Sequence, residues 1–84
     1  MYYVYILKSE TSGRYYIGYS DFPERRLREH NSGKVKSTRP FRPWIKVYQE
    51  IHNTETLARN REEEIKSKKS RSYIEWLIKV DTSR

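Results

Sequence analysis

The chain has 84 residues, of which 18 are Lys or Arg and 11 are Asp or Glu, for a formal charge of +7. This length suffices for one domain with a thin core, since a chain this small buries only about 60% of its unfolded surface. The absence of cysteine excludes a disulfide scaffold and thiolate zinc sites. No apolar run approaches membrane-spanning length, and no signal-peptide pattern opens the chain. We expect a soluble, cytoplasmic protein without a membrane partner. The positive charge suits a polyanion such as nucleic acid, although it could also serve solubility alone.

A hairpin of two short aromatic strands is expected first. Residues 2–7 and 14–19 are rich in aromatic and β-branched side chains, and residues 8–13 between them have turn composition. A four-residue loop inside this turn would pair Tyr5 directly with Tyr16 and set their hydroxyl groups side by side on one face. A one-residue slip would put them on opposite faces.

A helix is expected next. Asp21 can cap its start, Pro23 suits its first turn, and Glu24 can complete a capping box. The helix should run to about His30 and stop before Gly33.

A basic loop and a third strand follow this helix. Residues 33–43 form the loop, and residues 44–51 alternate well enough for a strand. The alternation places Trp44 and Tyr48 on one face of the strand and Val47 on the other.

Two helices complete the predicted α+β domain. Asn53 or Thr54 caps a helix that runs to about Lys69, and Ser70 caps a shorter helix that ends near Val80.

The sequence shows no repeat, linker or second domain. We therefore expect a single domain over residues 1–80 and a disordered tail over residues 81–84.

Two tyrosines and two side chains of the first helix are candidates for chemistry. Tyr5 and Tyr16 can pack with solvated hydroxyls, or one can act as a base if a neighbouring cation favours loss of its proton. Arg26 and His30 are four residues apart and share a helix face. Arg26 can bind phosphate through its planar fork or simply face solvent. His30 can exchange protons near neutral pH or interact with the helix dipole.

One carboxylate stands out in the second helix. Three consecutive glutamates could form a solvated run, but the spacing from Ala58 to Ile65 turns Glu62 toward the apolar stripe. A single carboxylate can hold Mg²⁺, because that ion keeps several waters and takes further oxygens from substrate phosphate. A multi-histidine metal site is not expected from only two histidines.

Basic side chains gather in the loop and after the second helix, where they could track a phosphate backbone or serve solubility. The candidate nucleic-acid-binding residues are Lys34, Lys36, Arg39, Arg42, Lys66 and Lys69. No Ser-His-Asp or Cys-His arrangement and no Gly-rich phosphate loop is present in the sequence.

The triplets Tyr3-Val4-Tyr5 and Tyr16-Ile17-Gly18 make the sequence resemble the GIY-YIG nuclease superfamily, especially its small stand-alone bacterial members. The resemblance gains specificity from Arg26, from the segment His30-Asn31-Ser32-Gly33, and from the helix that holds Glu62. It covers about residues 2 to 78.

The resemblance implies a fold and a set of roles. The fold would be a three-stranded antiparallel sheet flanked by helices, and the activity divalent-metal-dependent phosphodiester hydrolysis. Tyr16 would be the base or orient the attacking water, and Tyr5 would support it. Arg26 would bind the scissile phosphate, His30 would assist proton transfer, and Glu62 would be the metal ligand.

Two positions depart from the family pattern. Tyr3 stands where the first Gly of the motif is expected, and Tyr19 stands where some members carry a Lys that helps to activate the base. The resemblance also implies that Gly18 lets substrate approach the strand end.

The expected function is that of an endonuclease of low sequence specificity that uses Mg²⁺ or Mn²⁺, bound weakly without substrate, and no small-molecule cofactor. DNA is the favoured partner over RNA, and analogy suggests repair or the processing of single-stranded or branched DNA. The first alternative is a nucleic-acid-binding module with little or no catalysis, and another is a protein-interaction domain. The sequence carries no signal for the natural substrate or the oligomeric state.

Overall fold

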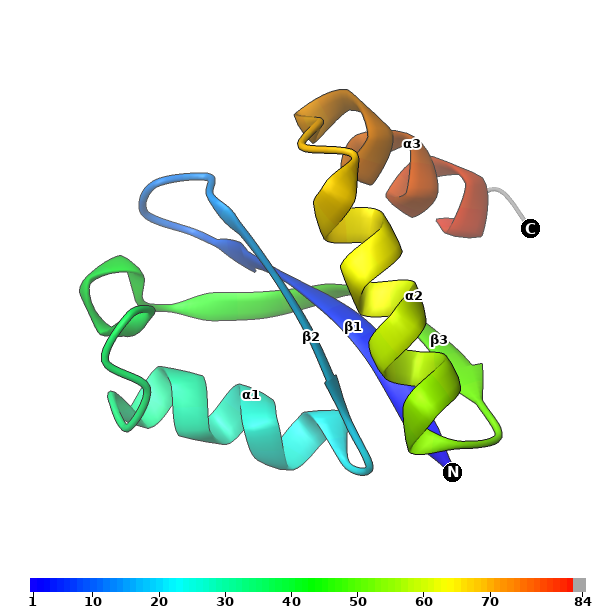
Figure 1. Cartoon of the computed structure of the whole chain (residues 1–84). Helices are drawn as coiled ribbons and strands as arrows, with labels where there is room; N and C mark the ends of the chain where they lie inside the picture. The colour runs from blue at the N-terminus through cyan, green and yellow to red at the C-terminus, as the bar shows by residue number, and fades with distance from the viewer. Residues whose placement is uncertain (83–84) are drawn as a thin grey trace.

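The structure, a computed structural model, describes residues 1–82 and shows a sheet between two layers of helices (Figure 1). The strands are β1 (Tyr2–Ser9), β2 (Tyr15–Ser20) and β3 (Trp44–His52). The helices are α1 (Pro23–Ser32), the short 3₁₀ helix η1 (Arg39–Phe41), α2 (Glu55–Ser67) and α3 (Arg71–Thr82). The strand order is β2-β1-β3, with both edge strands antiparallel to β1. The predicted three-stranded antiparallel sheet flanked by helices is confirmed.

The central strand β1 is buried on both faces. Val4 and Ile6 pack against α2 and α3 on one face, where the core includes Ala58, Ile65 and Leu77. Successive side chains of a strand point to opposite faces, so Tyr5 and Leu7 pack on the other face with Trp44, Leu27 of α1 and Phe41 of η1. The two faces of the sheet therefore hold two separate small cores.

The register of the hairpin differs from the prediction by two residues. Tyr5 lies opposite Gly18, and Tyr16 lies opposite Leu7. The strand β1 extends two residues further than predicted, β2 begins and ends one residue later, and the turn between them is closed by a left-handed Gly13 with a φ of 74°. A shift of two residues preserves the face of each side chain, so the two tyrosines still share a face but as diagonal neighbours.

The start of α1 is also different. Phe22 occupies the N-cap position and makes no side-chain capping hydrogen bond. The predicted cap, Asp21, instead accepts a hydrogen bond from Arg25 at 2.8 Å, and Glu24 pairs with Lys46 of β3 rather than completing a capping box. The first turn of α1 is thus held by Pro23 and by side-chain pairs.

A β-bulge in β3 overturns the predicted faces of that strand. Ile6 of β1 pairs with Tyr48, whereas the next residue, Leu7, pairs with Lys46, so one residue of β3 is left over. Such an insertion switches the faces on either side of it. Trp44 therefore joins the core on the α1 side, and Tyr48 packs against the core on the α2 side.

The predicted helix ends agree with the structure more closely than the predicted start of α1 does. Gly33, with a φ of 87°, terminates α1 as predicted, and the hydroxyls of Thr54 and Ser70 accept the backbone N–H groups of the first turns of α2 and α3. The helix α3 continues to Thr82, so the predicted disordered tail is wrong for residues 81 and 82, and residues 83–84 lie outside the described part. No helix between residues 1 and 82 is long and apolar enough to cross a membrane.

Candidate active site

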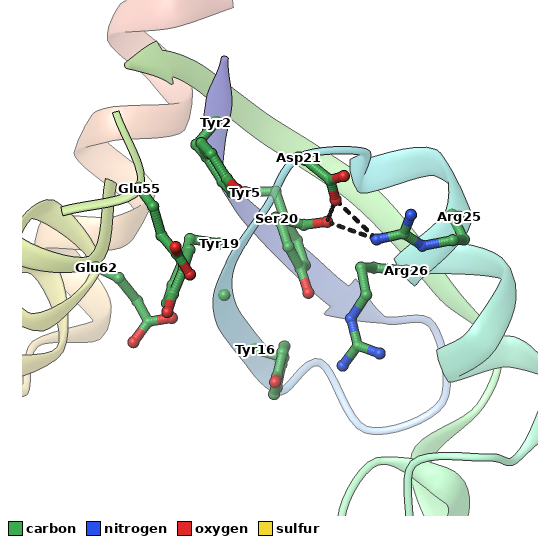
Figure 2. A pocket seen from close by; sticks show the side chains of 11 residues that line it. Tyr2, Tyr5, Tyr16, Tyr19, Ser20, Asp21, Arg25, Arg26, Glu55 and Glu62 are labelled. Carbon is green, nitrogen blue, oxygen red and sulfur yellow. Dashed lines mark hydrogen bonds and ion pairs between the residues drawn. The ribbon is translucent and has the colours of Figure 1, made fainter. Parts of the chain in front are cut away.

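A pocket of about 540 Å³ opens beside the edge strand β2 and is bounded by α1 and α2 (Figure 2). We call it the active pocket. Four of the five predicted catalytic residues line it: Tyr5 of β1, Tyr16 of β2, Arg26 of α1 and Glu62 of α2. Its volume lies within the range of small-molecule and cofactor sites. Three consecutive elements and the more distant α2 thus bring their polar groups to one opening.

The rings of Tyr5 and Tyr16 can pack against each other because the residue opposite Tyr5 on β2 is Gly18. Their ring centroids are 6.3 Å apart, with the planes tilted by 35°. A Cβ atom on Gly18 would lie 2.6 Å from the Tyr5 hydroxyl and 3.2 Å from Cε1 of Tyr16. Gly18 is therefore needed to make room for Tyr5, a different reason from the substrate access that the resemblance implied.

Arg26 extends from α1 toward the tyrosines (Figure 2). Its guanidinium pairs with Glu29 one turn later on the same helix and lies beside the Tyr5 hydroxyl. Burial raises the pKa of Tyr5 to about 12, and the Arg26 cation offsets only part of that effect. Tyr5 is therefore a protonated hydrogen-bond donor at neutral pH, and the half-buried Tyr16 is the tyrosine open to the pocket.

His30 does not line the active pocket but lies behind both tyrosines. Its side chain is fully buried, its Nε2 is 3.5 Å from the Tyr5 hydroxyl, and its ring centroid is 4.5 Å from that of Tyr16. The pKa of His30 is lowered to about 4, first by burial and then by the nearby Arg26 cation, while Glu29 opposes the shift. His30 is thus a neutral imidazole at pH 7.

Thr38 orients His30, and sequence reasoning missed it. The Thr38 hydroxyl lies 2.8 Å from His30 Nδ1, and its backbone carbonyl accepts the indole N–H of Trp44 at 2.9 Å. The hydroxyl also donates to the carbonyl of Val35 at 3.3 Å. A threonine in a basic loop carries no signal of this role, because the contact depends on how the loop folds back against α1.

The acidic side of the pocket is formed by α2. Glu62 is the inward member of the three consecutive glutamates, as predicted, with 14% of its side chain exposed. It forms an ion pair of 3.1 Å with Lys66 one turn later. Glu55 of α2 and Asp21 also line the pocket and were not predicted.

The donor set of the pocket fits Mg²⁺ or Mn²⁺ better than a structural metal. Among residues 1–82, no cluster of three or more His, Cys, Asp or Glu side chains could enclose an ion. Glu62, with Glu55 at the same pocket, offers the hard oxygen ligands that Mg²⁺ accepts while it keeps waters and takes phosphate oxygens.

The predicted nucleic-acid-binding residues lie outside the active pocket. Lys66 and Lys69 line a second pocket near the end of α2. In the loop, Arg39 and Arg42 donate to backbone carbonyls of Gly33 and Arg39, which holds the loop together. Lys34 and Lys36 are exposed in the same loop. Arg25, which was given no role, lines the active pocket.

Comparison with known proteins agrees with this arrangement. Residues 1–75 match the model of the GIY-YIG catalytic domain. The chain belongs to the GIY-YIG family. This family consists typically of endonucleases that act on DNA with divalent metal ions, so the GIY-YIG domain described here is a member of a nuclease family.

Several relatives of this GIY-YIG chain are UPF0213 proteins. One from Staphylococcus haemolyticus is 42% identical over 66 residues, which cover 77% of this chain and 79% of the relative. One from Haloquadratum walsbyi is 44% identical over 66 residues, or 77% of this chain and 73% of the relative. The solution NMR structure of a UPF0213 protein from Bacillus halodurans is 35% identical, with a TM-score of 0.59 over 95% of this chain and 85% of that one.

Proposed function

We propose that this GIY-YIG domain is a divalent-metal-dependent endonuclease that hydrolyses phosphodiester bonds in DNA. The observation that carries the proposal is the convergence of Tyr16, Arg26 and Glu62 on one open pocket from β2, α1 and α2. These side chains supply a proton acceptor, a phosphate-binding fork and a metal-binding carboxylate. Metal-assisted hydrolysis of a phosphodiester uses all three.

Arg26 binds the scissile phosphate in this proposal. Its guanidinium is charged at every accessible pH and its fork matches two phosphate oxygens. Glu29 holds the arginine from the side of α1, and the Tyr5 hydroxyl lies against it. The guanidinium is therefore pre-positioned to stabilise the negative charge that builds up on the phosphate during attack, which is usually the largest single catalytic effect.

Tyr16 orients the attacking water and, after its own hydroxyl proton has passed to solvent, accepts a proton from that water. Its ring is fixed by contacts with Tyr5, His30 and Trp44, whose centroids lie 6.3, 4.5 and 6.5 Å away. The hydroxyl end is directed to the pocket. A Mg²⁺ or Mn²⁺ ion held by Glu62 would add positive charge at the phosphate and favour proton loss from water.

Tyr5 and His30 support this arrangement from behind. Tyr5 stays protonated, and its hydroxyl lies 3.5 Å from His30 Nε2 on one side and beside Arg26 on the other. His30 is neutral and buried, so it acts through Tyr5 by holding the hydroxyl in place rather than by meeting substrate. We therefore assign His30 as a positioning residue.

The pocket favours low sequence specificity. Its polar groups are suited to phosphate, water and metal and not to the edges of bases, which carry sequence information. DNA strands with single-stranded or branched character would enter most readily, because the active pocket opens beside β2, an edge strand of the sheet.

The test is cleavage of labelled single-stranded, duplex and branched DNA, and of RNA, with Mg²⁺, Mn²⁺ or a chelator. We expect metal-dependent cuts in DNA and a rate about 10²–10³ lower for Glu62→Gln. Glu63→Gln is the matched control, because Glu63 is the exposed neighbour on the same helix. The proposal is wrong if no substrate is cut with either metal, or if Glu62→Gln cuts as fast as Glu63→Gln.

One observation favours a second candidate, a nucleic-acid-binding module without catalysis. Tyr19 lines the active pocket at the position where some family members place a lysine that helps to activate the base. Without that lysine, only Arg26 and the metal ion are left to activate Tyr16 as a base. This alternative predicts salt-sensitive binding of oligonucleotides and no metal-dependent cleavage in the same experiment.

A further inference from the structure

A second pocket of about 440 Å³ lies at the other end of β2, where the connection from α2 to α3 passes the edge of the sheet. We call it the basic pocket. Four cationic side chains line it: Arg14, Lys66, Lys69 and Arg71. No carboxylate of residues 1–82 lines it, so its rim attracts anions.

The floor of the basic pocket is apolar. Ile17 of β2, Ile65 of α2 and Ile74 of α3 meet there, with the ring of Tyr15 beside them. Ile17 and Ile74 are only half-buried, so they leave apolar surface open to the pocket. A charged rim above an apolar floor suits a ligand with both an anionic group and a flat or apolar body, as a nucleotide has.

The four rim cations differ in what already holds them. Arg71 is anchored by a hydrogen bond of 2.9 Å to the carbonyl of Gly13 and by an ion pair of 3.2 Å with Glu75. Arg14 and Lys69 are exposed and form no ion pair with any residue of the described range; the Arg14 guanidinium lies over the ring of Phe41, 4.2 Å from its centroid. Arg14 and Lys69 therefore keep their charge available to a phosphate.

The basic pocket is close to the active pocket along two elements. The later residues of β2 line the active pocket (Tyr16, Gly18, Tyr19 and Ser20), and Tyr15 and Ile17 line the basic one. On α2, Glu62 and Lys66 are one turn apart, or about 5.4 Å. One helical turn of about 5.4 Å, and two to three strand residues at about 3.3 Å each, place the pockets roughly 5 to 10 Å apart, or roughly two or three nucleotides at about 3.4 Å per stacked nucleotide.

We propose that the basic pocket binds a nucleotide of the DNA strand that flanks the cut, with its phosphate on Arg14 and Lys69 and its base or sugar on the isoleucine floor. The proposal rests on the proposed nuclease function and adds a subsite to it. It explains how a small domain could hold a strand across the edge of β2 and keep the scissile phosphate in register.

The first test measures binding of a labelled single-stranded DNA in a chelator at several salt concentrations. The test protein carries Arg14→Gln and Lys69→Asn, because asparagine tolerates the left-handed backbone of Lys69, whose φ is 46°. The control carries Arg59→Gln and Lys68→Gln, which remove the same charge from residues that line neither pocket.

We expect the slope of log affinity against log salt to become shallower by about 0.7 in the double variant, because the protein no longer neutralises the one phosphate of the subsite. The same relation corresponds to an affinity on the order of 5-fold weaker per phosphate at 0.1 M salt. Equal slopes and affinities for the two double variants would overturn the subsite.

The second test separates the subsite from the nuclease itself. Substrates whose flank is trimmed one nucleotide at a time are cut by the wild type and by both double variants. We expect kcat/KM to rise when the flank reaches two or three nucleotides, and the Arg14→Gln/Lys69→Asn protein to lack that rise. Cleavage without any dependence on flank length overturns only the subsite. Selective binding without cleavage overturns the nuclease but leaves a nucleotide-binding pocket.

Discussion

The two faces of the sheet carry two polar networks of opposite character. On the α1 face, Tyr5, His30, Thr38 and Trp44 are joined by hydrogen bonds among neutral groups in a buried setting. On the α2 face, Glu50 of β3 is the centre of a charged network. It accepts hydrogen bonds from Tyr48 and from Arg61, and its other oxygen lies 2.8 Å from His52.

The neutral network belongs to the candidate active site, and the charged network holds structural elements together. The neutral network ends at the Tyr5 hydroxyl, which faces Arg26 and the active pocket. The charged network ends at Arg61, whose side chain connects β3 to α2 and, through Tyr73, to α3. We therefore expect changes in the first network to alter catalysis and changes in the second to alter stability.

The largest expected effect is on the site side, at Arg26. Arg26→Gln should lower the cleavage rate by about 10²–10³, because it removes the charge that stabilises the attacked phosphate. The melting temperature should change little, since Arg26 is 32% exposed and its pair with Glu29 is a surface pair. Rates at saturating metal measure the effect.

Arg25→Gln is the matched control for that prediction. Arg25 precedes Arg26 on α1 and lines the same pocket, but it pairs with Asp21 at 2.8 Å and is 45% exposed. A decrease as large for Arg25→Gln as for Arg26→Gln would show that general charge, and not the position of one guanidinium, supports activity.

His30 makes the neutral network sensitive to acid. Its pKa is about 4 in the folded protein and about 6.5 in an unfolded chain. The unfolded state therefore binds the extra proton first, and the free energy of unfolding should fall as the pH drops from 6.5 toward 4, by up to about 3 kcal/mol. Urea titrations at several pH values measure this slope.

His30→Gln should flatten the slope between pH 6.5 and 4.5. The carboxyls of Glu29 and Glu50 have lowered pKa values. The stability that they contribute is therefore lost only below this pH range, and they do not add to the slope within it. An unchanged slope in His30→Gln would contradict a neutral, buried His30.

Substitutions in the charged network should change the free energy of unfolding and leave the cleavage rate unchanged. Glu50→Gln leaves Arg61, which is 21% exposed, without the carboxylate that both of its contacts of 3.2 Å require. We expect a decrease of about 2 kcal/mol in the free energy of unfolding, below the value for a fully buried pair because some solvent reaches the site. Chemical denaturation measures it, and activity per folded molecule should stay the same.

Glu64→Gln tests the same arginine from its solvent side. Glu64 pairs with Arg61 at 2.8 Å but is 54% exposed, so its removal should cost at most about 0.5 kcal/mol. If both variants were destabilised equally, or if Glu50→Gln slowed cleavage in the folded state, the division between the two faces would not hold.

The sequence was sufficient to predict the elements and much of the site. Periodicity and turn residues located the three strands and three longer helices, and helical spacing correctly turned Glu62 inward from two exposed neighbours. The roles of Tyr16, Arg26 and Glu62 stay predictions until cleavage is measured. These positions could be identified because each depends on local spacing within one element.

Features that depend on how elements meet could not be predicted. The β-bulge in β3 moved Tyr48 to the face opposite Trp44, and nothing in a strand-like alternation marks an inserted residue. Asp21 and Glu24 have the composition of a capping box, but Asp21 pairs with Arg25 four residues later, and Glu24 pairs with Lys46, which only the folded chain brings near.

Gly18 is part of a motif that the sequence shows, but its role depends on how two strands meet. Its substitution has the smallest of the expected effects on the site side. A Cβ at this position would lie 2.6 Å from the Tyr5 hydroxyl and 2.7 Å from its Cζ, so Gly18→Ala must move the ring at the end of the neutral network. Overpacking of this kind costs about 1 to 2 kcal/mol. The displaced hydroxyl should also lower the cleavage rate while leaving the Glu50 network intact.

A double-mutant cycle decides whether the Tyr5 ring is the cause. In a Tyr5→Leu background the clash is removed, so Gly18→Ala should cost much less stability than it does in the wild type, as measured by urea denaturation. An equal cost in both backgrounds would mean that the backbone of β2 itself, and not the aromatic ring across from it, requires glycine. The φ of Gly18 lies outside the left-handed region, which argues for the ring.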